Sequence, residues 1–167
     1  MAGPTNKALD HEALLRRAFE IARRVRDQGG HPFGALLVGP DGAVLLEQGN
    51  EFMTGRDMTA HAERVLATRA SQAYGPQFLA GCTLYTSAEP CAMCAGAIYF
   101  AGIGTVVYGQ SEKSLKEMTG NHPENPTLAL PCRMVFDSGQ RKTEVIGPLL
   151  EDEGRALQAD FWPARRD

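Results

Sequence analysis

The sequence contains no uninterrupted apolar run of the ~18 residues that a membrane-spanning helix needs, and its opening residues lack the apolar core of a secretory signal. It also carries little net charge, -3 in total, so no general attraction to phosphate backbones or membrane surfaces is expected. Cysteine is scarce, with four in the chain, and a close pair in a cytosolic protein indicates metal binding or redox chemistry before a structural disulfide. We therefore expect a soluble, cytoplasmic protein without a membrane segment.

Length and hydrophobicity indicate one globular domain. The 167 residues, 43% of them hydrophobic, suffice for one domain with a substantial core and are too few to favour two. No internal repeat or low-complexity linker divides the chain. We expect a single domain over residues 1–167.

The apolar patterns predict helices that alternate with strands. Spacings of three and four, together with proline at helix starts, predict helices over 14–25, 61–73, 91–101 and 148–162. Short apolar runs between turn residues predict a hairpin within 32–50 and strands over 82–87, 104–109 and 143–147. The sequence of residues 111–131 predicts a short helical turn followed by a long loop. Loops of this length in a compact domain usually have a functional role. This order is typical of a layered α/β sandwich, and the hairpin makes its sheet mixed.

Two fragments carry residues suited to metal chemistry, HAE at 61–63 and PCAMC at 90–94. One imidazole, His61, and two thiolates, Cys91 and Cys94, would give zinc three protein ligands and leave its fourth tetrahedral position open for water. Both ligand groups stand at predicted helix starts, where the helix dipole and backbone N–H groups favour thiolate. A zinc ion held in this way lowers the pKa of water from 15.7 to ~7.

Glu63 lies two positions after His61, and these positions do not share a face of a regular helix. The two side chains can therefore reach one site only if they flank the first turn and Glu63 reaches back. A carboxylate beside the metal can take a proton from water, pass it to a ring nitrogen and then deliver it to a leaving amine. We expect Glu63 to be this proton shuttle.

A structural zinc site is the alternative interpretation, in which the protein is a zinc-stabilised binding module and not an enzyme. Such a site would be closed by a fourth ligand, for which Cys82, Cys132 and His122 are the candidates. The ordinary expectation is different for all three. Cys82 opens a strand, Cys132 sits in a polar loop and His122 precedes a proline in a loop, so simple packing is favoured for each.

These fragments resemble the zinc-deaminase signature H-x-E followed by P-C-x-x-C. More broadly, the chain resembles the cytidine deaminase-like superfamily, in particular the branch with guanine deaminases, fungal-type cytosine deaminases and tRNA adenosine deaminases. The resemblance runs from about Pro32 to Gly109, chiefly in PFGALLV, TAHAE and SAEPCAMCAGAIYFAGIGTVVYG. It implies a three-layer α/β/α sandwich with a mixed five-stranded sheet. It also implies one zinc ion per chain, held by His61, Cys91 and Cys94, and hydrolytic release of ammonia.

The resemblance further implies a set of substrate contacts. It implies that the side chain of Asn50 hydrogen-bonds the substrate base, since an amide can donate and accept at once. Backbone groups of Ala62 and Ser87 are implied as further contacts to the base. Phe33 is a candidate for the pocket wall. The second acid that guanine deaminases of this branch use would align near Ser114, so Glu112 is the nearest substitute.

Departures from the resembled branches leave the substrate open. Ala88 replaces the cysteine usual in guanine deaminases, and Ser87-Ala88 also departs from the Thr-Leu common in tRNA enzymes. We favour a small-molecule base or nucleoside, most of all guanine or a related aminated ring, as the substrate. The alternatives are cytosine deamination and tRNA-specific adenosine deamination. For the latter, the arginines of 16–26, together with Arg165 and Arg166, would contact phosphate. The resemblance also implies a homodimer, while the aromatic tail, Phe161 and Trp162, is expected to pack on the sheet.

Overall fold

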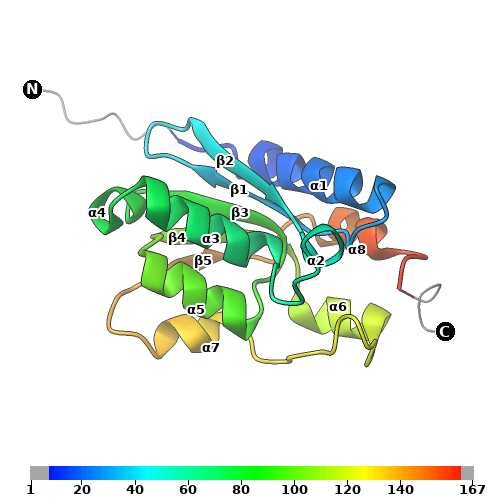
Figure 1. Cartoon of the computed structure of the whole chain (residues 1–167). Helices are drawn as coiled ribbons and strands as arrows, with labels where there is room; N and C mark the ends of the chain where they lie inside the picture. Colours follow the sequence, from blue (N-terminus) through cyan, green and yellow to red (C-terminus); the bar gives the residue numbers. More distant parts are fainter. Residues whose placement is uncertain (1–7, 163–167) are drawn as a thin grey trace, which may run out of the picture.

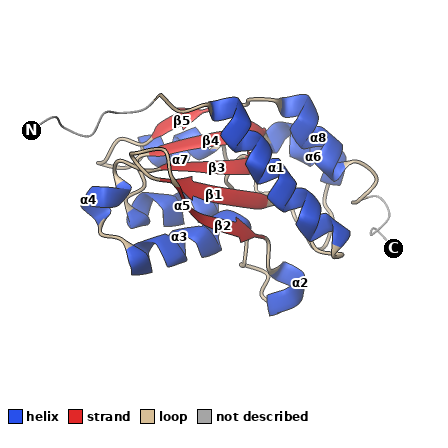
Figure 2. Ribbon diagram, turned by 90° about the horizontal axis from the view of Figure 1, so that it is seen from above, coloured by secondary structure: helices blue, strands red, loops and turns tan. Residues whose placement is uncertain are grey.

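A five-stranded sheet organises the part of the chain that the computed structural model describes, residues 8–162. The strand order is β2-β1-β3-β4-β5 (Figure 2). β1 pairs antiparallel with β2 and with β3, whereas β3, β4 and β5 are parallel. The strands are β1 Gly34–Val38, β2 Val44–Gly49, β3 Thr83–Ala88, β4 Thr105–Gln110 and β5 Glu144–Ile146. The predicted mixed sheet is therefore confirmed.

Helices cover both faces of the sheet (Figure 1). α1 and α8 pack on one face around Leu36 and Tyr85, while α3, α5 and α7 pack on the other around Leu37 and Leu84. Within residues 8–162, no helix is long and apolar enough to cross a bilayer. The helices are α1 His11–Asp27, α2 Phe52–Gly55, α3 Ala62–Ala73, α4 Pro76–Leu79, α5 Ala92–Ala101, α6 Glu112–Thr119, α7 Cys132–Asp137 and α8 Glu151–Gln158.

Local sequence explains how the first helix is placed on the sheet. Asp10 caps α1 by accepting a hydrogen bond from the backbone N–H of Ala13, at 3.0 Å. At the start of β1, a Cβ on Gly34 would stand 2.6 Å from the backbone nitrogen of Ala22. Only glycine lets the strand approach the helix this closely. The interface is sealed by buried side chains such as Phe19.

The predicted order was wrong in its short helices, in the place of Cys132 and in the start of the last helix. The four-residue helices α2 and α4 and the six-residue α7 were not predicted, because a helix of one turn shows no apolar period. Cys132 does not sit in a polar loop. It begins α7, fully buried against α5. Pro148 lies before the last helix, which starts only at Glu151.

Candidate active site

His61, Cys91 and Cys94 meet at the starts of α3 and α5, as the sequence predicts. His61 is the residue before the first turn of α3, and Cys91 holds the same position in α5, directly after β3. The Nδ1 atom of His61 lies 3.5 Å from the Sγ atom of each cysteine. All three potential ligand atoms lie within 4.8 Å of one another.

This geometry fits a zinc ion. Bonds of ~2.3 Å to sulfur and ~2.05 Å to nitrogen, at a tetrahedral angle, hold N and S ~3.5 Å apart. The two N···S distances have this length. The neighbouring Cys94 thiol and the His61 ring lower the pKa of Cys91 to about 4, so this sulfur is readily held as the thiolate that zinc requires. The two distances from His61 to the sulfurs therefore suit a shared zinc ion.

The fourth ligand required by a structural zinc site is not found among the described residues. The group of side chains close enough to share an ion contains only His61, Cys91 and Cys94. Cys82 instead donates to the carbonyl of Phe78, at 3.5 Å, and Cys132 is buried in the core. Three protein ligands leave a position for water, which is the arrangement of a catalytic site.

Glu63 lies beside this group, buried to 5% exposure in the first turn of α3. Its Oε1 atom accepts a hydrogen bond from the hydroxyl of Thr86 on β3, at 2.6 Å. Burial raises the pKa of Glu63 above its ordinary value. A buried carboxyl group beside the proposed metal ligands is placed to exchange protons with a water there, as a shuttle must.

A cavity of about 450 Å³ opens over His61, Cys91 and Glu63, while Cys94 lies buried beneath its surface. Its floor includes Glu89, and its far wall is the loop 123–128 that follows α6. The described lining contains four glutamates and neither lysine nor arginine. The cavity is thus suited to a ligand that presents N–H groups and is poorly suited to a phosphate.

Three of the predicted substrate contacts line this cavity: Asn50, Phe33 and Glu112. The Oδ1 atom of Asn50 accepts from the backbone N–H of Phe52, at 2.9 Å, which leaves the amide nitrogen as the donor available to a base. Ala62 and Ser87 are not part of the lining. The Ser87 hydroxyl accepts from the backbone N–H of Gly34, at 3.1 Å, and the contacts predicted for the two backbones stay predictions.

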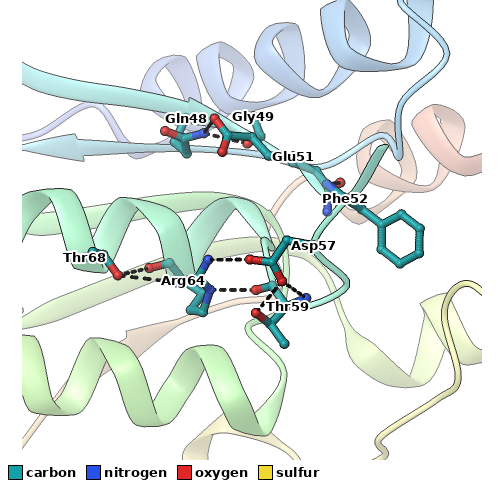
Figure 3. A network of polar contacts seen from close by, with 9 residues as sticks. Gln48, Gly49, Glu51, Phe52, Asp57, Thr59, Arg64 and Thr68 are labelled. Atoms are coloured by element: carbon teal, nitrogen blue, oxygen red, sulfur yellow. Dashed lines mark hydrogen bonds and ion pairs between the residues drawn. The ribbon is translucent and has the colours of Figure 1, made fainter. Parts of the chain in front are cut away.

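The segment between β2 and α3, which carries Asn50 and leads to His61, is fixed by a polar network (Figure 3). Arg64 of α3 donates to the carbonyl of Thr59, at 2.6 Å, and forms an ion pair with Asp57, at 3.6 Å. Asp57 in turn accepts from the backbone N–H and hydroxyl of Thr59. These contacts hold the chain immediately before the metal ligand in one conformation.

Glu89 is a site residue that was not predicted. One carboxylate oxygen accepts from the backbone N–H of Glu112, at 3.1 Å, and the other from that of Cys132, at 2.8 Å. Glu89 therefore joins the starts of α6 and α7 under the cavity. Its place in the SAEPC fragment was the available signal, but its partners lie 23 and 43 positions away and are not visible in the sequence.

Glu112 lines the cavity at the first turn of α6, whereas Ser114 faces the other way. Ser114 accepts hydrogen bonds from Arg155, at 2.6 Å, and from Gln110, at 3.1 Å, and is 4% exposed. Burial, followed by the negative charges of Cys91 and Glu89, raises the pKa of Glu112 to about 7. Glu112 is thus a second acidic side chain in the cavity wall, and its role toward a substrate stays a prediction.

The pKa of Glu112 predicts a pH-dependent difference in stability. Because folding raises this pKa from 4.5, the folded protein holds the proton more tightly, and the carboxyl group costs stability as pH rises from about 4.5 to about 7. A Glu112→Gln variant does not titrate there. Its melting temperature relative to the wild type should therefore rise by a few degrees, as an order of magnitude, between pH 5 and pH 8. A difference that is the same at both pH values would contradict this assignment.

Phe161 and Trp162 are buried, but they pack on the rings of His31 and Phe33 before β1 and not on the sheet, where the sequence placed them. Trp162 is fully buried and lies edge-on to His31, with ring centroids 4.9 Å apart, and 6.1 Å from the ring of Phe33. Neither tail residue is part of the cavity lining. They support the wall formed by His31 and Phe33 from behind.

The sandwich fold and the three-ligand site, with a buried carboxyl group beside its open position, define a zinc-dependent hydrolase. The family model of the cytidine and deoxycytidylate deaminase zinc-binding region matches residues 9–110. The chain therefore belongs to this family, and it is a hydrolytic deaminase that acts on C–N bonds, as the motifs predict.

Relatives of the chain include enzymes with different substrates. A probable cytosine deaminase of Schizosaccharomyces pombe is 37% identical over 159 residues, covering 92% of this chain and 93% of the relative. A tRNA-specific adenosine deaminase of Bacillus subtilis is 36% identical over 157 residues, covering 93% and 91%. The solved structure of a guanine deaminase from Nitrosomonas europaea matches with a TM-score of 0.75 and 25% identity, over 98% of this chain and 86% of that one.

Proposed function

We propose that the protein deaminates a free purine base, guanine or a closely related aminated ring, to the corresponding carbonyl compound and ammonia. The observation that carries the proposal is the composition of the cavity, which four carboxyl groups line without lysine or arginine. A neutral base with several N–H groups satisfies such a lining, whereas a phosphate would be repelled. The likeness to a solved guanine deaminase supports the same substrate class.

The side chains divide the work of hydrolysis between them. Asn50 and the apolar wall of Phe33 orient the ring, and Glu112 accepts from an N–H group at its far edge. Zinc, when bound by His61, Cys91 and Cys94, supplies the acidification of water that makes hydroxide available at neutral pH.

Glu63 carries the protons through the reaction. It takes the proton released as water adds to the ring carbon and gives it to the adjacent ring nitrogen. It then takes the second proton, from the hydroxyl group formed on the ring carbon, and gives it to the amino group, so that the C–N bond breaks and ammonia leaves as the carbonyl forms. Burial of Glu63 keeps this exchange away from bulk water.

A substrate panel tests the proposal. Purified zinc-loaded protein is given guanine, adenine, cytosine and their nucleosides, and ammonia release is measured for each. We expect the highest kcat/KM with guanine and much lower values with the nucleosides. Release from nucleosides alone would refute the proposal, and release from cytosine alone would assign the protein to the cytosine deaminases.

A tRNA adenosine deaminase is the second candidate function, supported by the relative from Bacillus subtilis. Five of the arginines proposed for phosphate contact lie on α1, and the other two, Arg165 and Arg166, lie outside the described residues. On α1, Arg16 donates to Glu153, at 3.0 Å, and Arg24 lies 3.7 Å from Glu47. These acids reduce the positive charge available to an RNA. Binding of an anticodon stem-loop with a steep dependence on salt would favour this function over ours. The homodimer and the cytoplasmic location stay predictions.

A further inference from the structure

The Thr86 side chain is the polar partner of Glu63. Successive residues of β3 face opposite sides of the sheet, and Leu84 packs with α3 and α5 whereas Tyr85 packs with α1. Thr86 therefore faces α3, where Glu63 lies. It is fully buried, and its hydroxyl oxygen is 2.6 Å from Oε1 of Glu63 and 3.0 Å from the carbonyl oxygen of Ala88.

This arrangement gives the hydroxyl two neighbours but only one proton to donate. When Glu63 is a carboxylate, Thr86 donates to Oε1. When Glu63 carries a proton on Oε2, Oε1 is a carbonyl oxygen that still accepts from Thr86. The same contact can therefore hold Oε1 whether or not Oε2 carries the proton in transfer.

We propose that Thr86 is a positioning residue for the reaction, which holds Oε1 of Glu63 and leaves Oε2 to exchange protons in the cavity. The inference rests on the proposed shuttle role of Glu63. A side chain without this anchor can rotate about its terminal bonds, so the carboxyl group would spend less time in the productive orientation. The metal ligands and Asn50 do not contact Thr86 in any hydrogen bond between described residues, so binding of zinc and substrate should not depend on it.

The test compares Thr86→Val, which keeps the shape and removes the hydroxyl, with Thr86→Ser, which keeps the hydroxyl. For the valine variant we expect kcat to fall about 10- to 100-fold, the range for losing one hydrogen bond to a charged group, with KM within about twofold of the wild type. Zinc content should be unchanged, and the serine variant should recover most of the lost kcat. Thr83→Val, the same change elsewhere on β3, is the matched control for the effect of the substitution on the strand. If the valine variant does not fold, Thr86→Ala supplies the hydroxyl-free comparison.

The outcomes separate this inference from the proposed shuttle. If Glu63→Gln is inactive and Thr86→Val keeps the wild-type kcat, the inference fails while the shuttle stands. If Glu63→Gln is fully active, the shuttle itself fails. An equal loss in the valine and serine variants, or a loss of zinc with the valine variant, would assign Thr86 a merely structural role and overturn the inference.

Discussion

We expect Glu63→Gln to lower kcat by about 100- to 10,000-fold, because Glu63 is the buried carboxyl group beside His61 that we assign to carry protons from water to the ring and to the leaving amine. Glutamine has nearly the same shape as glutamate and can still bond the hydroxyl of Thr86, which Glu63 contacts at 2.6 Å. The fold and the metal ligands should therefore be preserved. The measurement is steady-state ammonia release with the best substrate of the panel, together with zinc content by mass spectrometry and thermal melting.

A control variant tests whether the loss depends on the place of Glu63 in the site and not on the removal of a negative charge. Glu117→Gln makes the same chemical change on the exposed side of α6, where Glu117 lies 3.7 Å from Arg155, and should leave kcat unchanged. A Glu63→Gln protein that retains zinc, melts like the wild type and turns over at the wild-type rate would refute the shuttle mechanism. Equal losses in both variants would point to a general effect of lost charge.

The metal site could be predicted from the sequence because its chemistry lies in short, local patterns. Two fragments place a histidine and two cysteines at helix starts, and the strand-helix context of each is visible in the apolar periods around it. The order of the main helices and strands follows from the same periods. The hairpin among these elements also predicted that the sheet is mixed, but the order and register of its strands depend on contacts between distant segments and could not be predicted.

The rest of the site depends on contacts between distant segments. Glu89 gains its role only when the starts of α6 and α7 come together, and Thr86 gains its role because α3 crosses the face of β3 on which it lies. The loop 123–128 completes the cavity although it carries no periodic pattern. Glu112 was identified only as the acid nearest to an aligned serine, and the turn of α6 decides that it, and not Ser114, faces the cavity.

Cys82 and Cys132 show that residue type alone does not distinguish a metal-binding cysteine from a core cysteine. The sequence offers four thiols, and the spacing of Cys91 and Cys94 distinguishes one pair from the others. Burial raises the pKa of Cys82 to about 11 and that of Cys132 to about 12, so both stay protonated at neutral pH. They behave as small core residues, and Cys91 and Cys94 at the start of α5 are the two cysteines suited to bind zinc.

Removal of zinc should abolish turnover completely in the wild type. In a Cys94→Ser variant, added zinc should not restore the turnover. Dialysis of the wild type against a chelator should reduce ammonia release to the background level, and one equivalent of zinc should restore it, since the site contains three suitable donors. Serine is a poor zinc ligand at neutral pH, so the variant should contain far less than one ion per chain. Because zinc binding favours the folded state, the variant should also melt at a lower temperature than the zinc-loaded wild type.

Cys82→Ser provides the matched control, since Cys82 is equally buried yet bonds only the carbonyl of Phe78 among described residues. This variant should keep its zinc and its kcat. Activity that survives complete removal of zinc, or a Cys94→Ser protein with a full equivalent of the ion, would mean that His61, Cys91 and Cys94 do not form the metal site. A parallel loss of zinc in Cys82→Ser would instead indicate that Cys82 closes the site as a fourth ligand, which would make the zinc structural and remove the open position that hydrolysis requires.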